Sequence, residues 1–176
     1  MYDPQVLERA AKVRLAIFDV DGVLTDGRLF FDHEGHEFKA FHARDGHGLR
    51  LLQLSGVETA VISGRTSAAV ALRCESLGIR HVYQGYLDKL AALEHLRQIT
   101  GVEFSQIAYV GDDVLDLPVM RRVQLAIAVQ DAHFVVKRYA HWITENSGGL
   151  GAAREVCDLI MHAQGTFDAI VGRYLQ

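Results

Sequence analysis

The stretch Leu15-Ala16-Ile17-Phe18-Asp19-Val20-Asp21-Gly22-Val23-Leu24-Thr25-Asp26 decides how this chain folds. Its apolar start, residues 15–18, is typical of a short strand buried on both faces of a parallel sheet. Gly22 permits the sharp turn by which the chain leaves the sheet. Asp19 and Asp21 follow the strand directly, and two carboxylates this close repel each other unless positive charge separates them. Taken alone, the stretch is also compatible with an Asp-rich hairpin turn.

The composition indicates one globular domain, over residues 1–176, with enough apolar side chains for a substantial core. A net charge of −4 gives no sign of a basic, nucleic-acid-binding surface. Charged residues interrupt residues 1–14, so no signal peptide is predicted, and no apolar run approaches the ~20 residues of a membrane span. Cys74 and Cys157 form no C-x-x-C pair and are interpreted as reduced, packed thiols. We therefore expect a cytoplasmic protein without nucleic-acid or membrane partners.

Strand and helix patterns alternate along the chain. The predicted strands are 15–18, 58–62, 81–83, 107–110, 125–129 and 142–144, and the predicted helices are 3–12, 47–55, 67–77, 88–100, 118–123, 132–139 and 152–161. Because each parallel crossover needs a helix, this order predicts an α/β, Rossmann-like, doubly wound parallel sheet. Asp45 is the predicted cap of the helix at 47–55. Residues 27–41 predict a β-hairpin insertion with Gly35 at a left-handed position, and a flexible C-terminal tail is predicted from about residue 147.

Polar side chains follow several of these strands, and parallel strands end at one edge of a sheet. Asp19, Asp21, Ser63, Asp112 and Asp113 are expected at that edge, where doubly wound sheets bind their ligands. The carboxylates, with Asp116, form an oxygen-only cluster that favours Mg²⁺ over zinc. A carboxylate nucleophile, a cation, the Ser63 hydroxyl and the Lys89 ammonium suit phosphoryl transfer through an aspartyl-phosphate.

In this order, the same residues resemble the four motifs of the haloacid dehalogenase superfamily. The motifs are D-x-D-G-V-x-T-D at residues 19–26, S-G-R at 63–65, Lys89, and G-D-D-x-x-D at 111–116. A cap domain would enter after the first motif or between the lysine and the last motif. The first gap holds only the hairpin, and one helix and one strand fill the second, so the chain resembles the members that have no cap domain.

The resemblance implies roles for the clustered residues. Asp19 attacks phosphorus, and Asp21 protonates the leaving oxygen and then activates water. Ser63 and Lys89 hold the phosphoryl oxygens. Magnesium is bound by the Asp19 carboxylate, the Asp21 backbone carbonyl and Asp112. Asp113 and Asp116 lie behind these ligands, where Asp116 steers Lys89.

From about Val13 to Met161 the chain is similar to one branch, the 3-deoxy-D-manno-octulosonate 8-phosphate phosphatases. The residues that carry this similarity are the hairpin and the segments 43–46, 65, 73–74, 77–79, 83–85, 148–151 and 154–157. Two features depart from the branch: Ser63 replaces a threonine that many members carry, and the tail past Met161 is longer than expected. By this resemblance the substrate contacts are Asp21, His42, Ala43, Arg44, Asp45, Gly46, Arg50, Arg65, Arg73 and Lys89.

Simpler interpretations remain for some of these residues. Arg44, Arg50, Arg65 and Arg73 are also compatible with arginines that face only solvent. Histidines in and after the hairpin lack the cysteine or third ligand typical of a zinc site. The hairpin phenylalanines Phe30, Phe31, Phe38 and Phe41 are too many for one small face, so an interface between subunits is predicted. The resemblance implies a homotetramer.

The expected function is therefore magnesium-dependent hydrolysis of 3-deoxy-D-manno-octulosonate 8-phosphate, an acidic sugar phosphate, in lipopolysaccharide precursor synthesis. A phosphatase for another keto-acid sugar, such as a nine-carbon sialic-acid-type 9-phosphate, is one alternative. A catalytically silent sugar-phosphate binding module is the other, although the chain keeps Asp19, Asp21, Lys89 and Asp112.

Overall fold

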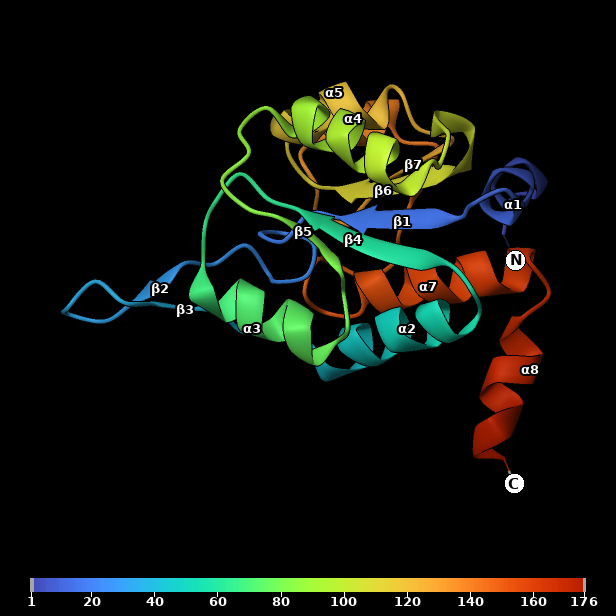
Figure 1. Ribbon diagram of the computed structural model, residues 1–176, viewed down its shortest axis with the longest axis horizontal. Helices are drawn as coiled ribbons and strands as arrows, with labels where there is room; N and C mark the ends of the chain where they lie inside the picture. Colours follow the sequence, from blue (N-terminus) through green and yellow to red (C-terminus); the bar gives the residue numbers. More distant parts are fainter. Residues whose placement is uncertain (1, 176) are drawn as a thin grey trace.

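The computed structural model describes residues 2–175 and contains a six-stranded parallel sheet with the strand order β5-β4-β1-β6-β7-β8 (Figure 1). Its strands are β1 (Leu15–Phe18), β4 (Glu58–Ile62), β5 (His81–Tyr83), β6 (Ile107–Gly111), β7 (Leu125–Ala128) and β8 (Trp142–Ile143). The chain starts in the middle of the sheet, builds one half outward, and then crosses back to build the other half. This is the order of a Rossmann-like doubly wound sheet, so the predicted fold class is confirmed.

The central strand β1 is buried along its whole length. Ile17 lies between Ala60 of β4 and Tyr109 of β6, and all of these residues are fully buried. A strand with neighbours on both edges and helices on both faces has no polar side, which explains the uninterrupted apolar run at 15–18. Cys74 and Cys157 are free and buried, as predicted for packed thiols.

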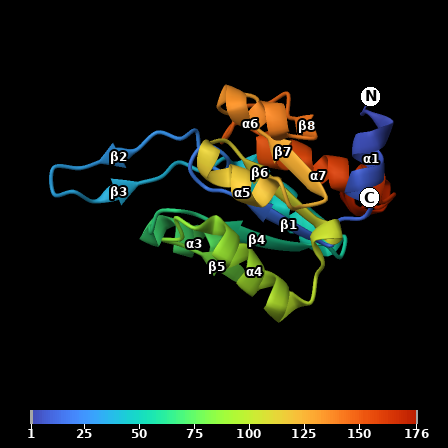
Figure 2. The same cartoon turned by 90° about the horizontal axis from the view of Figure 1, so that it is seen from above.

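Helices cover both faces of the sheet (Figures 1 and 2). They are α1 (Pro4–Ala11), α2 (Ala43–Leu54), α3 (Ala68–Ser76), α4 (Lys89–Thr100), α5 (Leu117–Met120), α6 (Phe134–Tyr139), α7 (Ala152–Ala163) and α8 (Phe167–Val171), with short 3-10 turns at Phe104–Gln106, Val114–Asp116 and Gly172–Tyr174. Helices α2, α3 and α7 lie on one face, and α4 and α5 lie on the other. No helix within residues 2–175 has the length and apolar character needed to span a bilayer.

The predicted hairpin is present, and it projects away from the sheet in Figure 1. It consists of β2 (Phe30–Phe31) and β3 (Glu37–Phe38), with Gly35 at a φ of 85° in the connecting turn. Three phenylalanine side chains, Phe30, Phe31 and Phe38, are about half exposed on it, at 46%, 56% and 57%. Between Lys89 and Asp112 the chain forms α4, a 3-10 turn and β6. A cap domain is therefore absent from residues 2–175, as predicted.

One capping prediction was wrong. Helix α2 begins at Ala43 after His42, so Asp45 lies inside its first turn. The buried Asp45 carboxylate instead accepts hydrogen bonds from the backbone N–H groups of Gly151 and Arg154, at 3.2 and 2.8 Å. These N–H groups belong to the start of α7, where the first turn of a helix has no internal partners. Asp45 thus caps a helix that lies more than a hundred residues further along the chain.

Residues 148–163 pack against the core, whereas α8 projects away from the sheet (Figure 1). A Cβ at Gly148 would lie 1.7 Å from the Gly22 carbonyl oxygen, and the Gly149 N–H donates to the Val23 carbonyl oxygen at 2.9 Å. Helix α7 follows, buries most of its apolar side chains, and packs against α2 and α1. The predicted helix at 152–161 is confirmed. The predicted flexibility of the tail concerns motion and stays a prediction. A single domain over residues 1–176 stays a prediction as well, and Met1 and Gln176 lie outside the described residues.

We predict that Asp45→Ala lowers the free energy of unfolding by about 1–2 kcal/mol, because two N–H groups of α7 lose their acceptor. In a domain of this size, that loss lowers the melting temperature by several degrees. Thermal melts of the Asp45→Ala and Asp168→Ala variants test this prediction. Asp168 is exposed on α8 and serves as the control. Equal melting temperatures for the two variants would contradict the capping role of Asp45.

Candidate active site

The strand order brings the predicted acidic residues together. Strands β1 and β6 are neighbours, and Phe18 lies opposite Val110, so Asp19 and Asp112 follow paired strand ends. Ser63 follows β4 on the other side of β1. All three lie at the carboxyl edge of the sheet, beside the point where the chain changes direction between β1 and β6. Doubly wound folds bind their ligands at this point.

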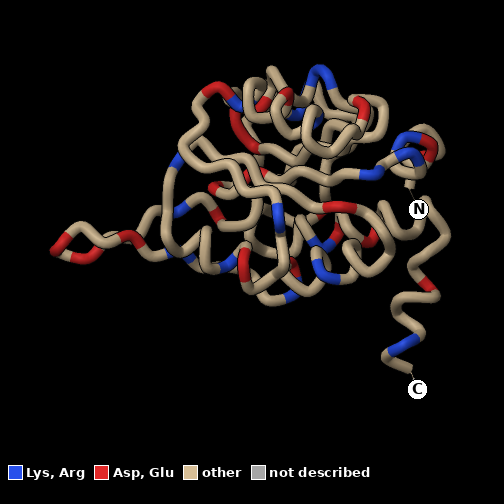
Figure 3. The backbone as a smooth tube through the Cα atoms, in the orientation of Figure 1, with Lys and Arg blue, Asp and Glu red and all other residues tan. Residues whose placement is uncertain are grey.

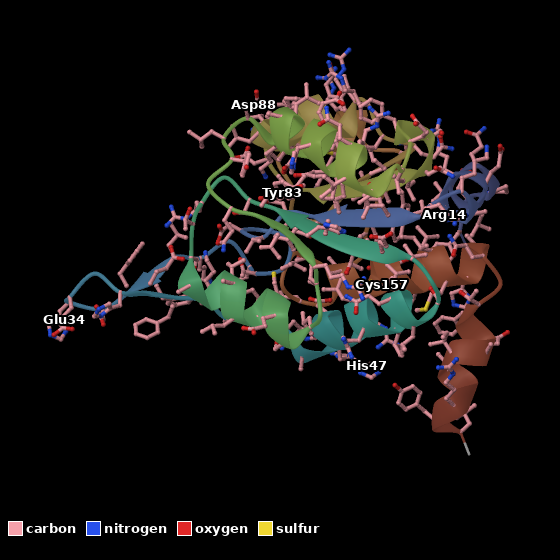
Figure 4. The ribbon with its side chains drawn as sticks, viewed as in Figure 1. Arg14, Glu34, His47, Tyr83, Asp88 and Cys157 are labelled. Carbon is pink, nitrogen blue, oxygen red and sulfur yellow. The ribbon has the colours of Figure 1, made fainter. Side chains whose placement is uncertain are left out.

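Lys89 is the one ammonium group found among the deepest carboxylates of residues 2–175. It is the first residue of α4, which is capped by the Asp88 carboxylate (Figure 4), and its side chain is only 3% exposed. Its Nζ lies 2.9 Å from Asp19 Oδ1 and 2.6 Å from Asp116 Oδ1. The Lys89 ammonium therefore neutralises part of a cluster whose carboxylates come from two different strand ends.

Asp116 is fully buried and already has its hydrogen-bond donors. Besides Lys89, it accepts from the Tyr109 hydroxyl at 2.7 Å and from the backbone N–H groups of Asp112 and Asp113, at 2.9 and 3.1 Å. The structure thus places Asp116 against Lys89, as expected from the sequence. With both oxygens engaged, Asp116 orients its neighbours and has little capacity left as a ligand.

The charges of the cluster shift the pKa values of its members. Burial raises the pKa of Asp19 to about 7, and the charge of Asp116 adds to the rise although Lys89 opposes it. Burial and the charge of Asp19 raise the pKa of Asp112 to about 8. Burial by itself would lower the pKa of Lys89, but Asp19 and Asp116 outweigh it and raise this pKa. The cluster has more buried negative charge than one lysine can balance.

The donors fit a magnesium ion. Oxygens of Asp19, Asp112 and Asp116 all lie within 4.8 Å of one another, and every donor is a carboxylate. Asp112 Oδ1 is buried and accepts no hydrogen bond, as expected for an oxygen that faces a cation. A Cβ at Gly22 would lie 2.1 Å from Asp112 Oδ2, so only glycine lets the backbone after Asp21 approach this carboxylate. The Asp19 and Asp112 carboxylates therefore fit two of the predicted magnesium ligands, and the Asp21 backbone carbonyl stays a prediction.

Ser63 occupies the neighbouring strand end. It is 2% exposed. Its backbone N–H donates to the carbonyl oxygen of Tyr83, the last residue of β5, and its carbonyl oxygen accepts from the N–H of Tyr86. Its hydroxyl oxygen accepts the N–H of Arg65 at 3.2 Å, which holds the turn after β4. The hydroxyl keeps its own proton to donate, and the predicted contact with a phosphoryl oxygen uses that proton.

Sequence reasoning missed two charged residues of the hairpin. The Lys39 side chain is 1% exposed, and its ammonium pairs with the Asp21 carboxylate and lies 3.1 Å from Glu37 Oε1. Glu37 Oε2 lies 2.5 Å from Arg65 Nη2, and Arg65 Nε lies 3.8 Å from Asp21 Oδ2. The available signal was alternation: Glu37 and Lys39 are two residues apart on an extended segment and share a face, opposite to Phe38.

Part of the predicted substrate loop gathers around Arg73. A Cβ at Gly46 would lie 2.1 Å from Arg73 Nη2, so the guanidinium lies directly on the first turn of α2. The guanidinium carbon also lies 5.9 Å from the centre of the Phe41 ring. His42 Nδ1 is buried there without a hydrogen-bond partner. The structure therefore brings His42, Gly46 and Arg73 together, with Ala43 at the start of α2.

Two predicted contacts, Arg44 and Arg50, lie elsewhere in this chain, and Asp45 lines the same hollow as His42, Gly46 and Arg73 but is engaged with α7. Arg50 donates to the Leu77 carbonyl oxygen at 3.2 Å, near the amino ends of β4 and β5 and thus at the edge opposite to the carboxylates. Arg44 faces the start of α7, in a depression that it shares with Leu150 and Arg154. Asp45 is occupied by its two hydrogen bonds to α7. The structure does not bring these three side chains to the carboxylate cluster.

Comparisons with known proteins agree with this site. Residues 75–155 match the haloacid dehalogenase-like hydrolase family. The 3-deoxy-D-manno-octulosonate 8-phosphate phosphatase of Salmonella typhimurium is 46% identical over 170 residues, which are 97% of this chain and 90% of that protein. The corresponding Yersinia pestis phosphatase is 46% identical over 95% of this chain and 89% of that protein.

Solved structures agree as well. A probable YrbI family phosphatase from Pseudomonas syringae superposes with a TM-score of 0.98 at 49% identity, covering 99% of both chains. The 3-deoxy-D-manno-octulosonate 8-phosphate phosphatase of Moraxella catarrhalis, solved with a magnesium ion, a phosphate ion and a KDO molecule, has a TM-score of 0.96 at 42% identity. That comparison covers 98% of this chain and 99% of the other.

The sheet and the residues at its carboxyl edge define a haloacid dehalogenase-like hydrolase. Within that class, the 46% identity to the two curated phosphatases, over at least 95% of this chain, identifies the family. The chain belongs to the family of the 3-deoxy-D-manno-octulosonate 8-phosphate phosphatases.

We predict that metal-free protein loses stability as the pH rises from about 5 to about 8. Unfolded carboxyl groups have pKa values of about 4, so over this range the folded state binds more protons through Asp19 and Asp112 than the unfolded state does. Stability then falls as those protons leave. Added Mg²⁺ should raise the melting temperature, and more so at pH 8 than at pH 5.

Melting curves in chelator and in magnesium, at several pH values, measure both effects. In Asp112→Asn the magnesium-dependent rise should largely disappear, because one ligand charge is lost. A metal-free melting temperature that rises between pH 5 and pH 8 would contradict the charge account, as would an unchanged magnesium effect in the variant.

Proposed function

We propose that this protein is a magnesium-dependent phosphatase that hydrolyses 3-deoxy-D-manno-octulosonate 8-phosphate to the free sugar acid and phosphate, in the cytoplasm, toward lipopolysaccharide. The main support is the Asp19 carboxylate, held by Lys89 beside Asp112 at the carboxyl edge of the sheet. The Moraxella catarrhalis relative, solved with magnesium, phosphate and KDO, has the same fold at 42% identity.

In the first step, an Asp19 carboxylate oxygen attacks phosphorus, and the bond between phosphorus and the sugar oxygen breaks. Asp21, two residues further along the same turn, gives a proton to that leaving oxygen. The Lys89 ammonium and the Ser63 hydroxyl stabilise the negative phosphoryl oxygens. A preorganised ammonium in a buried site costs little reorganisation when the charge develops. The products are an aspartyl-phosphate at Asp19 and the sugar acid.

In the second step, Asp21 takes a proton from water, and the water oxygen attacks phosphorus. The bond between phosphorus and the Asp19 oxygen breaks, so the carboxylate is regenerated and phosphate leaves. Asp19, the Asp21 carbonyl and Asp112 would hold a magnesium ion, which would supply positive charge against the carboxylates and the phosphoryl oxygens. Asp116 orients Lys89, and Asp113 lies next to Asp116 in the turn after β6, outside the set of proposed magnesium ligands.

Substrate selection is assigned to the arginines and the loop beside the site. Arg65 lies within 4 Å of the Asp21 carboxylate, and Arg73 lies with His42 and Gly46. A guanidinium pairs well with the carboxylate of a keto-acid sugar. Arg44, Asp45 and Arg50 stay predicted contacts, although within one chain the Asp45 carboxylate is hydrogen-bonded to α7 and the Arg50 guanidinium to the Leu77 carbonyl oxygen.

Phosphate release from three substrates tests the function: the eight-carbon 8-phosphate, a nine-carbon sialic-acid-type 9-phosphate and p-nitrophenyl phosphate, each with magnesium. We expect the highest kcat/KM for the eight-carbon substrate. A clear preference for the nine-carbon substrate would replace the proposed substrate. A lack of turnover on all three would instead favour a silent binding module.

We predict that Asp19→Asn lowers kcat by at least about 10³-fold, since an amide does not form the phosphoenzyme. The melting temperature of the metal-free variant should stay the same or rise, because one buried negative charge is removed. Near-normal turnover would contradict the role of Asp19 as nucleophile.

We also propose a homotetramer built through the hairpins. Phe30, Phe31 and Phe38 are about half exposed, and an isolated two-stranded hairpin is marginally stable in water. Packing hairpins of several copies together covers these rings and shields the site, a task that falls to the cap domain in larger phosphatases.

We predict that Phe30→Glu with Phe38→Glu yields smaller species with weaker turnover of the sugar phosphate. Hydrolysis of p-nitrophenyl phosphate should partly survive, since the carboxylates belong to one chain. Phe134→Glu is the matched control, because Phe134 is 66% exposed on α6, away from the hairpin. Light scattering and kinetics on the same samples measure both outcomes. A fully active monomer would contradict the proposal that hairpins of neighbouring copies shield the site.

A further inference from the structure

Ion pairs connect the hairpin to the active site. Lys39 and Glu37 lie on or next to β3, and together with Asp21 and Arg65 they form a chain of alternating charges. The Lys39 ammonium lies between the Asp21 and Glu37 carboxylates, and the Arg65 guanidinium lies between the same two on the other side. With two positive and two negative members, this four-residue cluster carries no net charge.

The burial of Lys39 is unusual for its location. Its side chain is 1% exposed although the hairpin around it is open to solvent, and Asp21 and Glu37 are 19% and 14% exposed. Lysine is rarely buried unless it is paired, so a lysine in this place has a specific partner. Glu37 supplies that pairing from within the hairpin. Burial by itself would raise the pKa of Glu37, but Arg65 and Lys39 outweigh it and lower this pKa.

Unlike an ordinary surface ion pair, this cluster links the hairpin to a residue of the active site, Asp21. The apolar part of the hairpin faces solvent, as Phe30 and Phe38 show, and acidic residues gather at its tip (Figure 3). Within residues 2–175, the ion pairs that join β3 and Lys39 to the rest of the chain are those of Glu37 with Arg65 and of Lys39 with Asp21. One of their two partners is Asp21, the proposed acid and base. Within residues 2–175, Lys39 is the side chain that donates a hydrogen bond to the Asp21 carboxylate, and Arg65 Nε lies farther away, at 3.8 Å from Asp21 Oδ2.

We propose that Lys39 is a positioning residue for the phosphatase reaction: held by Glu37, it fixes the Asp21 carboxylate in the orientation that activates water against the aspartyl-phosphate. This inference rests on the proposed function. The hairpin thereby supplies one functional contact from within the same chain, in addition to any shielding of the site. A carboxylate on a glycine turn has several rotamers, and a buried ammonium beside it selects one of them.

The two steps of the reaction separate this role from others. p-Nitrophenolate leaves readily without a proton, so with p-nitrophenyl phosphate the first step has little need of Asp21. The second step still needs Asp21 to take a proton from water. A displaced Asp21 should therefore slow breakdown of the phosphoenzyme and leave its formation nearly unchanged. A misplacement of about 1 Å can cost about 10²-fold in rate.

Stopped-flow release of p-nitrophenol with magnesium tests the inference on wild type, Lys39→Met, Lys39→Arg and Arg28→Met. In Lys39→Met we expect a burst close to one p-nitrophenol per site at nearly the wild-type rate, followed by a steady rate lowered about 10²-fold. Lys39→Arg keeps the charge and should recover most of the steady rate. Arg28→Met removes an exposed cation from the same hairpin and should leave both phases unchanged.

The burst amplitude counts the sites that still form the phosphoenzyme, so a variant that folds poorly is recognised by a small burst. Burst and steady rates that fall together in Lys39→Met would overturn the positioning role, as would a change confined to KM, which indicates direct substrate binding. Wild-type protein that releases no product from p-nitrophenyl phosphate or from the sugar phosphate would overturn the proposed function, and the role of Lys39 with it.

Discussion

The Lys89 ammonium between Asp19 and Asp116 is the interaction on which the rest of the site depends. Parallel strands β1 and β6 end side by side, so any acidic residues that follow them are forced together. Burial makes that repulsion expensive, and it raises the pKa values of Asp19 and Asp112 to about 7 and about 8. One lysine, entering from the first turn of α4, relieves part of the cost. The remaining imbalance creates the affinity for a divalent cation and, through it, for an anionic substrate.

The same site also organises the chain around it. Asp116 uses both of its oxygens to orient Lys89, Tyr109 and the turn after β6. The turn after β1 is closed by Gly148 and Gly149, whose backbone lies so near to it that no side chain would fit. Asp45 then caps α7 immediately after that contact. Segments far apart in the sequence are thus joined by backbone approaches and buried polar contacts.

Much of this arrangement could be predicted from the sequence, for physical reasons. Short apolar runs ending in Asp or Ser specify buried parallel strands, and parallel strands share one carboxyl edge, so Asp19, Ser63 and Asp112 were expected together. The positions of Asp45, Arg44 and Arg50 could not be predicted in this way. Their partners are Leu77 at the end of α3 and the start of α7, which are distant in sequence, and helical periodicity does not say which neighbouring element each face of α2 meets. Lys39 was missed because its partner Asp21 is distant in sequence and their pairing depends on how the hairpin folds back.

The central claim is that Asp19 carries the phosphoryl group between the two steps. Rapid quenching during turnover, reduction with borohydride and peptide mass spectrometry locate an acyl phosphate directly, because reduction converts the phosphorylated aspartate to homoserine. The account predicts homoserine at position 19, formed only when substrate and magnesium are both present. Homoserine at another aspartate, or none at all during active turnover, would contradict it.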